Sequence, residues 1–185
     1  MMSKFTHPIV LCGFMASGKT ATAKAMGALI HSDYVDLDAE IERREGASIP
    51  EIFKEHGEEY FRHLERKTVM QVIHESPKII SLGGGALQNQ EILDGIKEQS
   101  ILVFLRPDFE LIFKRLITNK KRPLIAREWA ETRNPEIVKE RIKNVYLTRL
   151  PLYEQAHITQ PVESDWSPYQ VASKIFDQVS QFQSS

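Results

Sequence analysis

The chain has 185 residues, enough for one domain with a hydrophobic core, and 42% of them are hydrophobic. Its formal net charge is −1, so no basic excess points to nucleic acid as a partner. No stretch has the length of a membrane span, and the first residues lack the long apolar segment of a secretion signal. The single cysteine, Cys12, cannot form an internal disulfide. We therefore expect a cytoplasmic protein whose partners include neither membrane nor nucleic acid.

The first predicted elements are a strand, a glycine-containing loop and a helix. Residues 8–12 are apolar, as is typical of a buried parallel strand, and residues 21–30 are rich in helix formers. Between them, residues 13–20 read Gly-Phe-Met-Ala-Ser-Gly-Lys-Thr and fit the phosphate-binding pattern. In such a loop the amides and the helix N-terminus bind phosphate, the lysine reaches the outer phosphates and the threonine can bind Mg²⁺. This predicts a nucleotide-phosphate site made by Gly13, Ala16, Ser17, Gly18, Lys19, Thr20 and Ala21. The alternative is a plain glycine turn.

Residues 34–38 are predicted to form the second strand, with two acidic side chains at its end. Asp36 and Asp38 are two residues apart, which would place both on one face of a strand. Ligands of an α/β sheet bind beyond the carboxyl ends of its strands, so this pair suits Mg²⁺ handling and proton acceptance from a hydroxyl. The alternative is that Asp38 only caps a helix that begins at Ala39.

Residues 48–74 are predicted to be helical. Ser48-Ile49-Pro50-Glu51 is a capping box, and Gly57 should interrupt the helix that it starts. On the second part, residues 58–74, Arg62 and Glu65 are neighbours because they are three apart. Either they form an exposed surface pair, or Glu65 orients the arginine toward an acidic substrate.

The third strand, residues 78–82, is followed by Gly83-Gly84-Gly85. Three glycines after a strand allow a ligand to approach the backbone closely, although a flexible turn would look the same. A helix at 88–98, a strand at 101–105 and a helix at 108–117 should follow.

Residues 118–134 are basic at their start and show no clear helical pattern. We interpret them as a mobile lid that carries an arginine for the transferring phosphate; a solvated basic loop is the alternative. Asn134-Pro135 should begin a helix that ends before Pro151. An edge strand at 158–162 and a C-terminal helix from residue 167 complete the pattern. Alternating strands and helices predict a three-layer α/β fold around a parallel sheet.

Together these motifs resemble the shikimate kinases, within the nucleoside-monophosphate-kinase-like P-loop fold. The resemblance covers nearly the whole chain. It is carried by the phosphate loop, Asp36-Leu37-Asp38, Phe61-Arg62-His63-Leu64-Glu65, Gly83-Gly84-Gly85, Arg122-Pro123-Leu124, and Arg149 before Pro151-Leu152-Tyr153. It implies Mg²⁺-dependent phosphorylation of the 3-hydroxyl of shikimate by ATP, in the chorismate and aromatic amino acid pathway. It also implies a five-stranded parallel sheet in the order 2-3-1-4-5.

The resemblance further implies a single domain, residues 1–185, with a shikimate-binding helical segment at about 38–66, a lid at about 118–134, and a monomeric chain. The catalytic residues would be Lys19, Asp38 and the lid arginine Arg122. Shikimate would be bound by Asp38, Arg62, Gly83, Gly84, Gly85 and Arg149. ATP would be bound by the phosphate loop, by Arg115 along the adenine, and by Arg122. Mg²⁺ would be held by Thr20, with Asp36 acting through water.

Two positions depart from the pattern. Ala16 occupies a place where glycine is common, which predicts a slightly stiffer loop. The loop before the last helix is Asp165-Trp166-Ser167-Pro168, where a basic residue is often found, so the adenine contacts of this loop are left open.

Two other functions fit the same fold, because a fold does not fix a substrate. One is a kinase for gluconate or a nucleoside monophosphate, although Arg62, Arg149 and the triple glycine favour a polyol with a carboxylate. The other is a nucleotide-binding module without turnover, although Lys19, Asp38 and Arg122 are all present.

Overall fold

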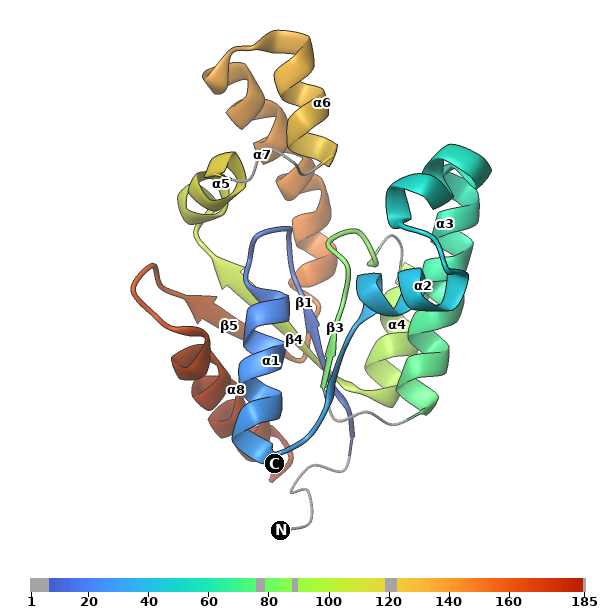
Figure 1. Ribbon diagram of the computed structural model, residues 1–185. Coiled ribbons are helices and arrows are strands. Elements are labelled where there is room, and N and C mark those ends of the chain that lie inside the picture. Colours follow the sequence, from blue (N-terminus) through green and yellow to red (C-terminus); the bar gives the residue numbers. More distant parts are fainter. Residues whose placement is uncertain (1–6, 76–78, 88–89, 119–122, 185) are drawn as a thin grey trace.

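The computed structural model describes residues 7–75, 79–87, 90–118 and 123–184, with residues 123–127 described by their backbone alone. A five-stranded parallel sheet occupies its centre, in the order β2-β3-β1-β4-β5 (Figure 1). The strands are β1 (Ile9–Cys12), β2 (Tyr34–Asp36), β3 (Ile79–Ser81), β4 (Ile101–Pro107) and β5 (Ile158–Val162). In register, Val10 of β1 lies opposite Ile80 of β3 and Leu102 of β4. The order that the resemblance implied is confirmed.

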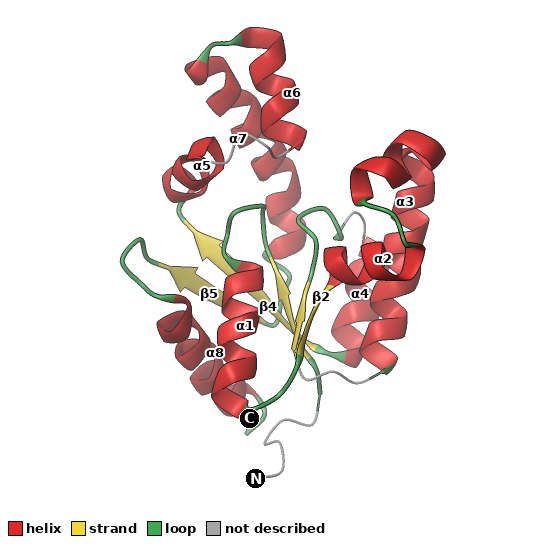
Figure 2. Ribbon diagram, in the orientation of Figure 1, coloured by secondary structure: helices red, strands yellow, loops and turns green. Residues whose placement is uncertain are grey.

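Helices cover both faces of this sheet (Figure 2). They are α1 (Lys19–Ile30), α2 (Leu37–Glu45), α3 (Ile49–His74), α4 (Gln90–Gln99), α5 (Phe109–Thr118), α6 (Pro123–Thr132), α7 (Pro135–Tyr153) and α8 (Pro168–Phe182). Because side chains alternate along a strand, β1 contributes residues to the hydrophobic cores on both faces of the sheet. Ile9 and Leu11 pack with α1 and α8, whereas Val10 and Cys12 pack with the helices of the other face. The predicted three-layer architecture is confirmed. None of the helices in the described ranges has the length and apolarity needed to cross a membrane.

Cys12 ends β1 directly below the phosphate loop. Its side chain is only 1% exposed. Burial raises the pKa of this thiol to about 12, although the charge of Lys19 acts in the opposite direction. The thiol therefore stays protonated and packs as a small apolar group.

The predicted helix starts at Ser48, Asn134 and Ser167 are confirmed. The Ser48 amide donates to Glu51 Oε2 at 2.8 Å, which completes the capping box of α3. The Asn134 side chain accepts from the amides of the first turn of α7, and Ser167 caps α8. Gly57 interrupts α3 as predicted, with φ 82° and ψ 177°.

The predicted strand at 34–38 is too long. The strand ends at Asp36, and α2 begins at Leu37. Asp36 is the N-cap: its Oδ1 accepts from the Ala39 amide at 3.3 Å. Asp38 therefore lies in the first turn of a helix. Both the shared strand face and the suggestion that Asp38 caps the helix are wrong.

Two further predictions about helices are wrong. Residues 123–132, within the proposed lid, form helix α6, which begins with a proline as helices often do. It is held to α7 by Arg141, which donates to Glu128 at 2.9 Å and to Glu131 at 2.7 Å. Helix α7 also continues through Pro151 to Tyr153. Pro151 has no amide hydrogen to donate to the Leu147 carbonyl, and Leu147 is an exposed residue.

Candidate active site

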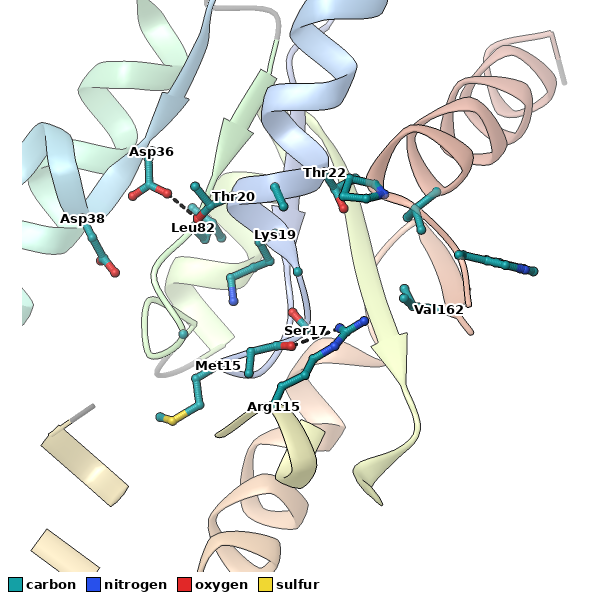
Figure 3. A pocket seen from close by; sticks show the side chains of 17 residues that line it. Met15, Ser17, Lys19, Thr20, Thr22, Asp36, Asp38, Leu82, Arg115 and Val162 are labelled. Atoms are coloured by element: carbon teal, nitrogen blue, oxygen red, sulfur yellow. Dashed lines mark hydrogen bonds between the residues drawn. The ribbon is translucent and has the colours of Figure 1, made fainter. Parts of the chain in front are cut away.

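A cavity of about 540 Å³ lies where the phosphate loop meets the ends of the neighbouring strands (Figure 3). Its walls come from the loop and the start of α1, from the β2–α2 junction, from the triple glycine, from α5 and from the β5–α8 loop. In Figure 1, α2 and α3 lie to the right of the phosphate loop, whereas α5, α6 and α7 lie toward the top. The cavity lies at the edge at which parallel α/β sheets bind their ligands.

The phosphate loop has the backbone that an anion site requires. Gly13 has φ 137°, and a Cβ there would lie 2.8 Å from the Leu105 carbonyl oxygen, so glycine is needed. Gly18, with φ 103°, leads into α1, whose first turn has no acidic residue. Lys19 Nζ donates to the carbonyls of Gly13 and Phe14, at 2.9 and 3.0 Å. Ser17 Oγ is buried and has no partner in the described part of the chain. The loop therefore offers donors to a phosphate.

Thr20 and Asp36 meet at the edge of the cavity. The Thr20 hydroxyl donates to Asp36 Oδ2 at 2.6 Å, and both residues line the cavity (Figure 3). A hydroxyl oxygen and a carboxylate oxygen next to a phosphate site are ligands that Mg²⁺ binds. The two residues therefore fit a Mg²⁺ ion held between the protein and a nucleotide.

Asp38 projects into the same cavity from the first turn of α2 (Figure 3). Burial raises the pKa of its carboxyl group, and the nearby charge of Asp36 adds to this effect, whereas Lys19 and Arg62 oppose it. A Cβ at position 83 would collide with this carboxylate, so Gly83 is required there. The result is a carboxylate with raised basicity at the base of the triple glycine.

Arg62 is held by a buried carboxylate. Its Nη1 donates to Glu65 Oε2 at 2.8 Å and its Nη2 to Glu58 at 3.2 Å. The Glu65 side chain is only 4% exposed, so the alternative of an exposed surface pair is wrong. Burial raises the pKa of Glu65, against the effect of Arg62. Arg62 Nε is buried without an acceptor in the described ranges. Glu65 and Glu58 thus orient Arg62, and its Nε–H remains available to donate to a ligand.

Helix α7 is tied to the triple glycine at one atom. The Gly84 carbonyl accepts from Arg149 Nη1 at 2.8 Å and from the Tyr153 hydroxyl at 2.9 Å. Arg149 also lies over the ring of Phe14, 5.8 Å from its centre. The bond made by Tyr153 was not predicted, although its place after Arg149 in the quoted motif was an available signal. Burial raises the pKa of the Tyr153 hydroxyl, which remains a donor.

The opposite end of the cavity is bounded by Arg115 of α5 and by the loop before α8. Arg115 Nη1 donates to the Ala16 carbonyl at 3.3 Å. Ala16 has φ 62°, a left-handed conformation that favours glycine. Trp166 and Pro168 also line the cavity, and Lys174 lies 4.5 Å from the centre of the Trp166 indole. Sequence reasoning left the adenine contacts of this loop open and did not single out these two residues, although a tryptophan two residues before a proline was visible.

The cavity brings together most of the residues predicted from the sequence. Those that line it are Ala16, Ser17, Gly18, Lys19, Thr20, Ala21, Asp36, Asp38, Gly84 and Arg115. Those not on its wall are Gly13, Arg62, Gly83, Gly85 and Arg149. Of these, Arg149 touches the wall through Gly84. Arg122 lies outside the described residues.

The model of one protein family, shikimate kinase, matches residues 15–180. The shikimate kinase of Thermodesulfovibrio yellowstonii is 36% identical over 167 residues, which are 90% of this chain and 91% of that protein. Among solved structures, shikimate kinase from Acinetobacter baumannii in complex with shikimate has a TM-score of 0.80 at 30% identity, with 94% of this chain and 92% of that one covered.

A gluconokinase from Sinorhizobium meliloti is also similar, with a TM-score of 0.59 at 14% identity, over 99% of this chain and 100% of that one. At this identity the likeness concerns the fold alone. The family match covers most of the residues, and the similarity to individual shikimate kinases covers nearly the full length of both chains. The chain belongs to the shikimate kinase family.

Proposed function

We propose that ATP binds on the phosphate-loop side of the cavity and shikimate between α2, α3 and the triple glycine, where its 3-hydroxyl receives the terminal phosphoryl group. Phosphorylation of shikimate by ATP is the reaction of this chain as a member of its family. One observation supports the assignment of residues above all others. Lys19 and Asp38 line the same cavity, so a phosphate and a hydroxyl bound at these two residues would meet (Figure 3).

Asp38 is the residue that we assign to the acceptor hydroxyl. The hydroxyl oxygen attacks the terminal phosphorus, the bond from phosphorus to the bridging oxygen breaks, and ADP leaves. The Asp38 carboxylate orients the hydroxyl and accepts its proton as the new P–O bond forms. Its raised pKa supports this role, because a more basic carboxylate holds the proton better. The loose transition state of phosphoryl transfer makes orientation the larger part of the effect.

The phosphate loop and Lys19 bind the phosphates of the nucleotide and neutralise their negative charge. The amides after Gly13 and at the start of α1 bind the phosphates, and Lys19 neutralises the oxygens of the transferred group. Mg²⁺ bound at Thr20, with Asp36 behind its water shell, would neutralise further phosphate charge. Arg122 is assigned as the lid arginine on the resemblance alone. The protein contributes mainly position and charge, since the transfer needs little covalent help.

Arg62 and Arg149 form the site for the shikimate carboxylate. Arginine binds a carboxylate through two parallel hydrogen bonds in one plane. The buried Arg62 Nε supports this assignment, because a buried donor without an acceptor costs about 1–3 kcal/mol. A substrate carboxylate that accepts from it would remove this cost. A monomeric state and a cytoplasmic location stay predictions; light scattering on the purified chain would check the first.

The decisive experiment is an acceptor screen. ADP release from ATP with Mg²⁺ is measured with shikimate, quinate, gluconate or AMP as the acceptor. We expect shikimate to give the highest rate by a wide margin, and the rate to fall to background when Mg²⁺ is removed. A higher rate with gluconate or AMP would contradict the assignment of Arg62 and Arg149 to the acceptor carboxylate.

A further inference from the structure

Tyr153 has no part in the reaction described above, although its hydroxyl contacts the wall of the cavity. We infer that Tyr153 is a positioning residue: it fixes the Gly84 peptide, so that Arg149 can turn to the acceptor without releasing the triple glycine. This inference rests on the proposed function, in which Arg149 binds the acceptor carboxylate.

The geometry centres on a single carbonyl oxygen. Gly84 O accepts from Arg149 Nη1 at 2.8 Å and from the Tyr153 hydroxyl at 2.9 Å. A carbonyl oxygen has two lone pairs, so these two bonds use its full capacity. Residues 149 and 153 are four apart on α7 and therefore lie on one face of the helix. One helix thus holds the loop twice, through two side chains of different kinds.

The two donors differ in rigidity. The Tyr153 side chain is 2% exposed and stacks on Phe104 of β4, with ring centres 5.3 Å apart and planes at 29°. The sheet therefore sets the position of its hydroxyl. Arg149 is less buried, and a long side chain of this kind has much more rotational freedom. When a carboxylate draws Arg149 away, Tyr153 keeps the carbonyl bonded.

The Gly84 peptide matters to both substrates. It lines the cavity, and a Cβ at this position would lie 3.3 Å from the Met15 amide nitrogen of the phosphate loop. If Arg149 alone held the loop, its bond to the Gly84 carbonyl would have to break before it could bind the acceptor, and the loop would then be released. A loop already fixed by Tyr153 leaves less to be ordered when shikimate binds, which favours affinity.

The variant Tyr153→Phe removes the hydroxyl and keeps the ring and its stacking. We expect the KM for shikimate to rise about 2- to 10-fold, the range for one neutral hydrogen bond. The KM for ATP should change by less than about twofold, because the phosphate loop keeps its own bonds. Tyr146→Phe is the matched control: it removes a tyrosine hydroxyl from the buried face of the same helix, near Arg106 instead of Gly84. It should behave like the parent.

Hydrogen exchange of the peptide that spans residues 82–87 provides a second readout, with faster exchange expected in Tyr153→Phe. Unchanged shikimate KM with unchanged exchange would overturn the inference. So would an equal rise of both KM values with a lower Tm, which would assign the hydroxyl to general stability. Arg149→Lys, measured in parallel, separates the two ideas. If it raises the shikimate KM and Tyr153→Phe does not, only the inference fails. If neither does, the acceptor site proposed above fails as well.

Discussion

Asp38→Asn separates the chemical role of this residue from its structural one. The amide has nearly the same shape but cannot accept the hydroxyl proton. Helix α2 should be unaffected, because its N-cap is Asp36. General-base assistance is worth about 10²–10⁴ in rate, and we expect kcat to fall by about 10² or more. A factor of 10² corresponds to about 2.7 kcal/mol of transition-state stabilisation. The affinity for ATP should stay near that of the parent.

The same change should make the protein more stable at neutral pH. The pKa of Asp38 is raised mainly by burial, so the folded chain binds this proton more tightly than the unfolded chain. The contribution of Asp38 to stability is therefore full at low pH and is lost as pH rises through the raised pKa. A gain of about 1 kcal/mol would raise the Tm by about 2–4 °C for a chain of this size. Asparagine is uncharged at every pH, so Asp38→Asn does not lose stability as the pH rises.

Three measurements on one preparation test this reasoning: turnover by ADP release, ATP titration, and thermal melting at several pH values. We expect low kcat, normal ATP binding, and a higher Tm at pH 7 whose excess over the parent shrinks as pH falls. Asp33→Asn, at an exposed position before β2, is the control and should match the parent. Activity of Asp38→Asn within a few-fold of the parent would refute the catalytic role. A lower Tm at pH 7 would refute the electrostatic argument.

Four further variants extend these tests. Arg62→Lys keeps the charge but lacks the planar fork, so the shikimate KM should rise about tenfold or more at constant ATP KM; Arg66→Lys, on the exposed side of α3, should leave both unchanged. Asp36→Asn keeps the helix cap and should raise the Mg²⁺ concentration for half-maximal activity several-fold; an unchanged Mg²⁺ titration would remove Asp36 from the ion site. Ala16→Gly should raise the Tm by about 2–4 °C, because relief of about 1–3 kcal/mol of backbone strain exceeds the entropy cost of glycine; a lower Tm would contradict the strain. Arg122→Ala should lower kcat by about 10³ with a smaller effect on the Kd for ATP; equal effects would indicate a ground-state role.

The elements that the sequence predicted well are those with strong local signals. A strand, a Gly-rich loop and a helix in direct succession leave few alternatives, and the caps at Ser48, Asn134 and Ser167 each bond within their own first turn. The order of the strands is different: it was expected from the resemblance, since nothing within one strand specifies its neighbours.

One error came from a local ambiguity: residues 34–38 alternate in polarity like a strand, but the Asp36 side chain caps α2 at the Ala39 amide. The other two errors arose where distant contacts decide the structure. Helix α6 is held by Arg141, a residue of the following helix, which no local pattern reveals. At Pro151 the local rule predicted a helix end. The helix continues because Tyr153 is anchored to Gly84 and Phe104.

The burial of Cys12 has a practical consequence for the study of this enzyme. The chain contains no other cysteine, and this thiol is enclosed and held in its unreactive protonated form. Alkylating reagents should therefore leave the native protein unmodified. One cysteine introduced at an exposed position of α3 and a second at an exposed position of α7 would then be the sole points of attachment for a pair of spin labels or fluorophores. Distances between α3 and α7 could be recorded, with and without substrates, in a chain that retains every one of its natural side chains near the phosphate loop.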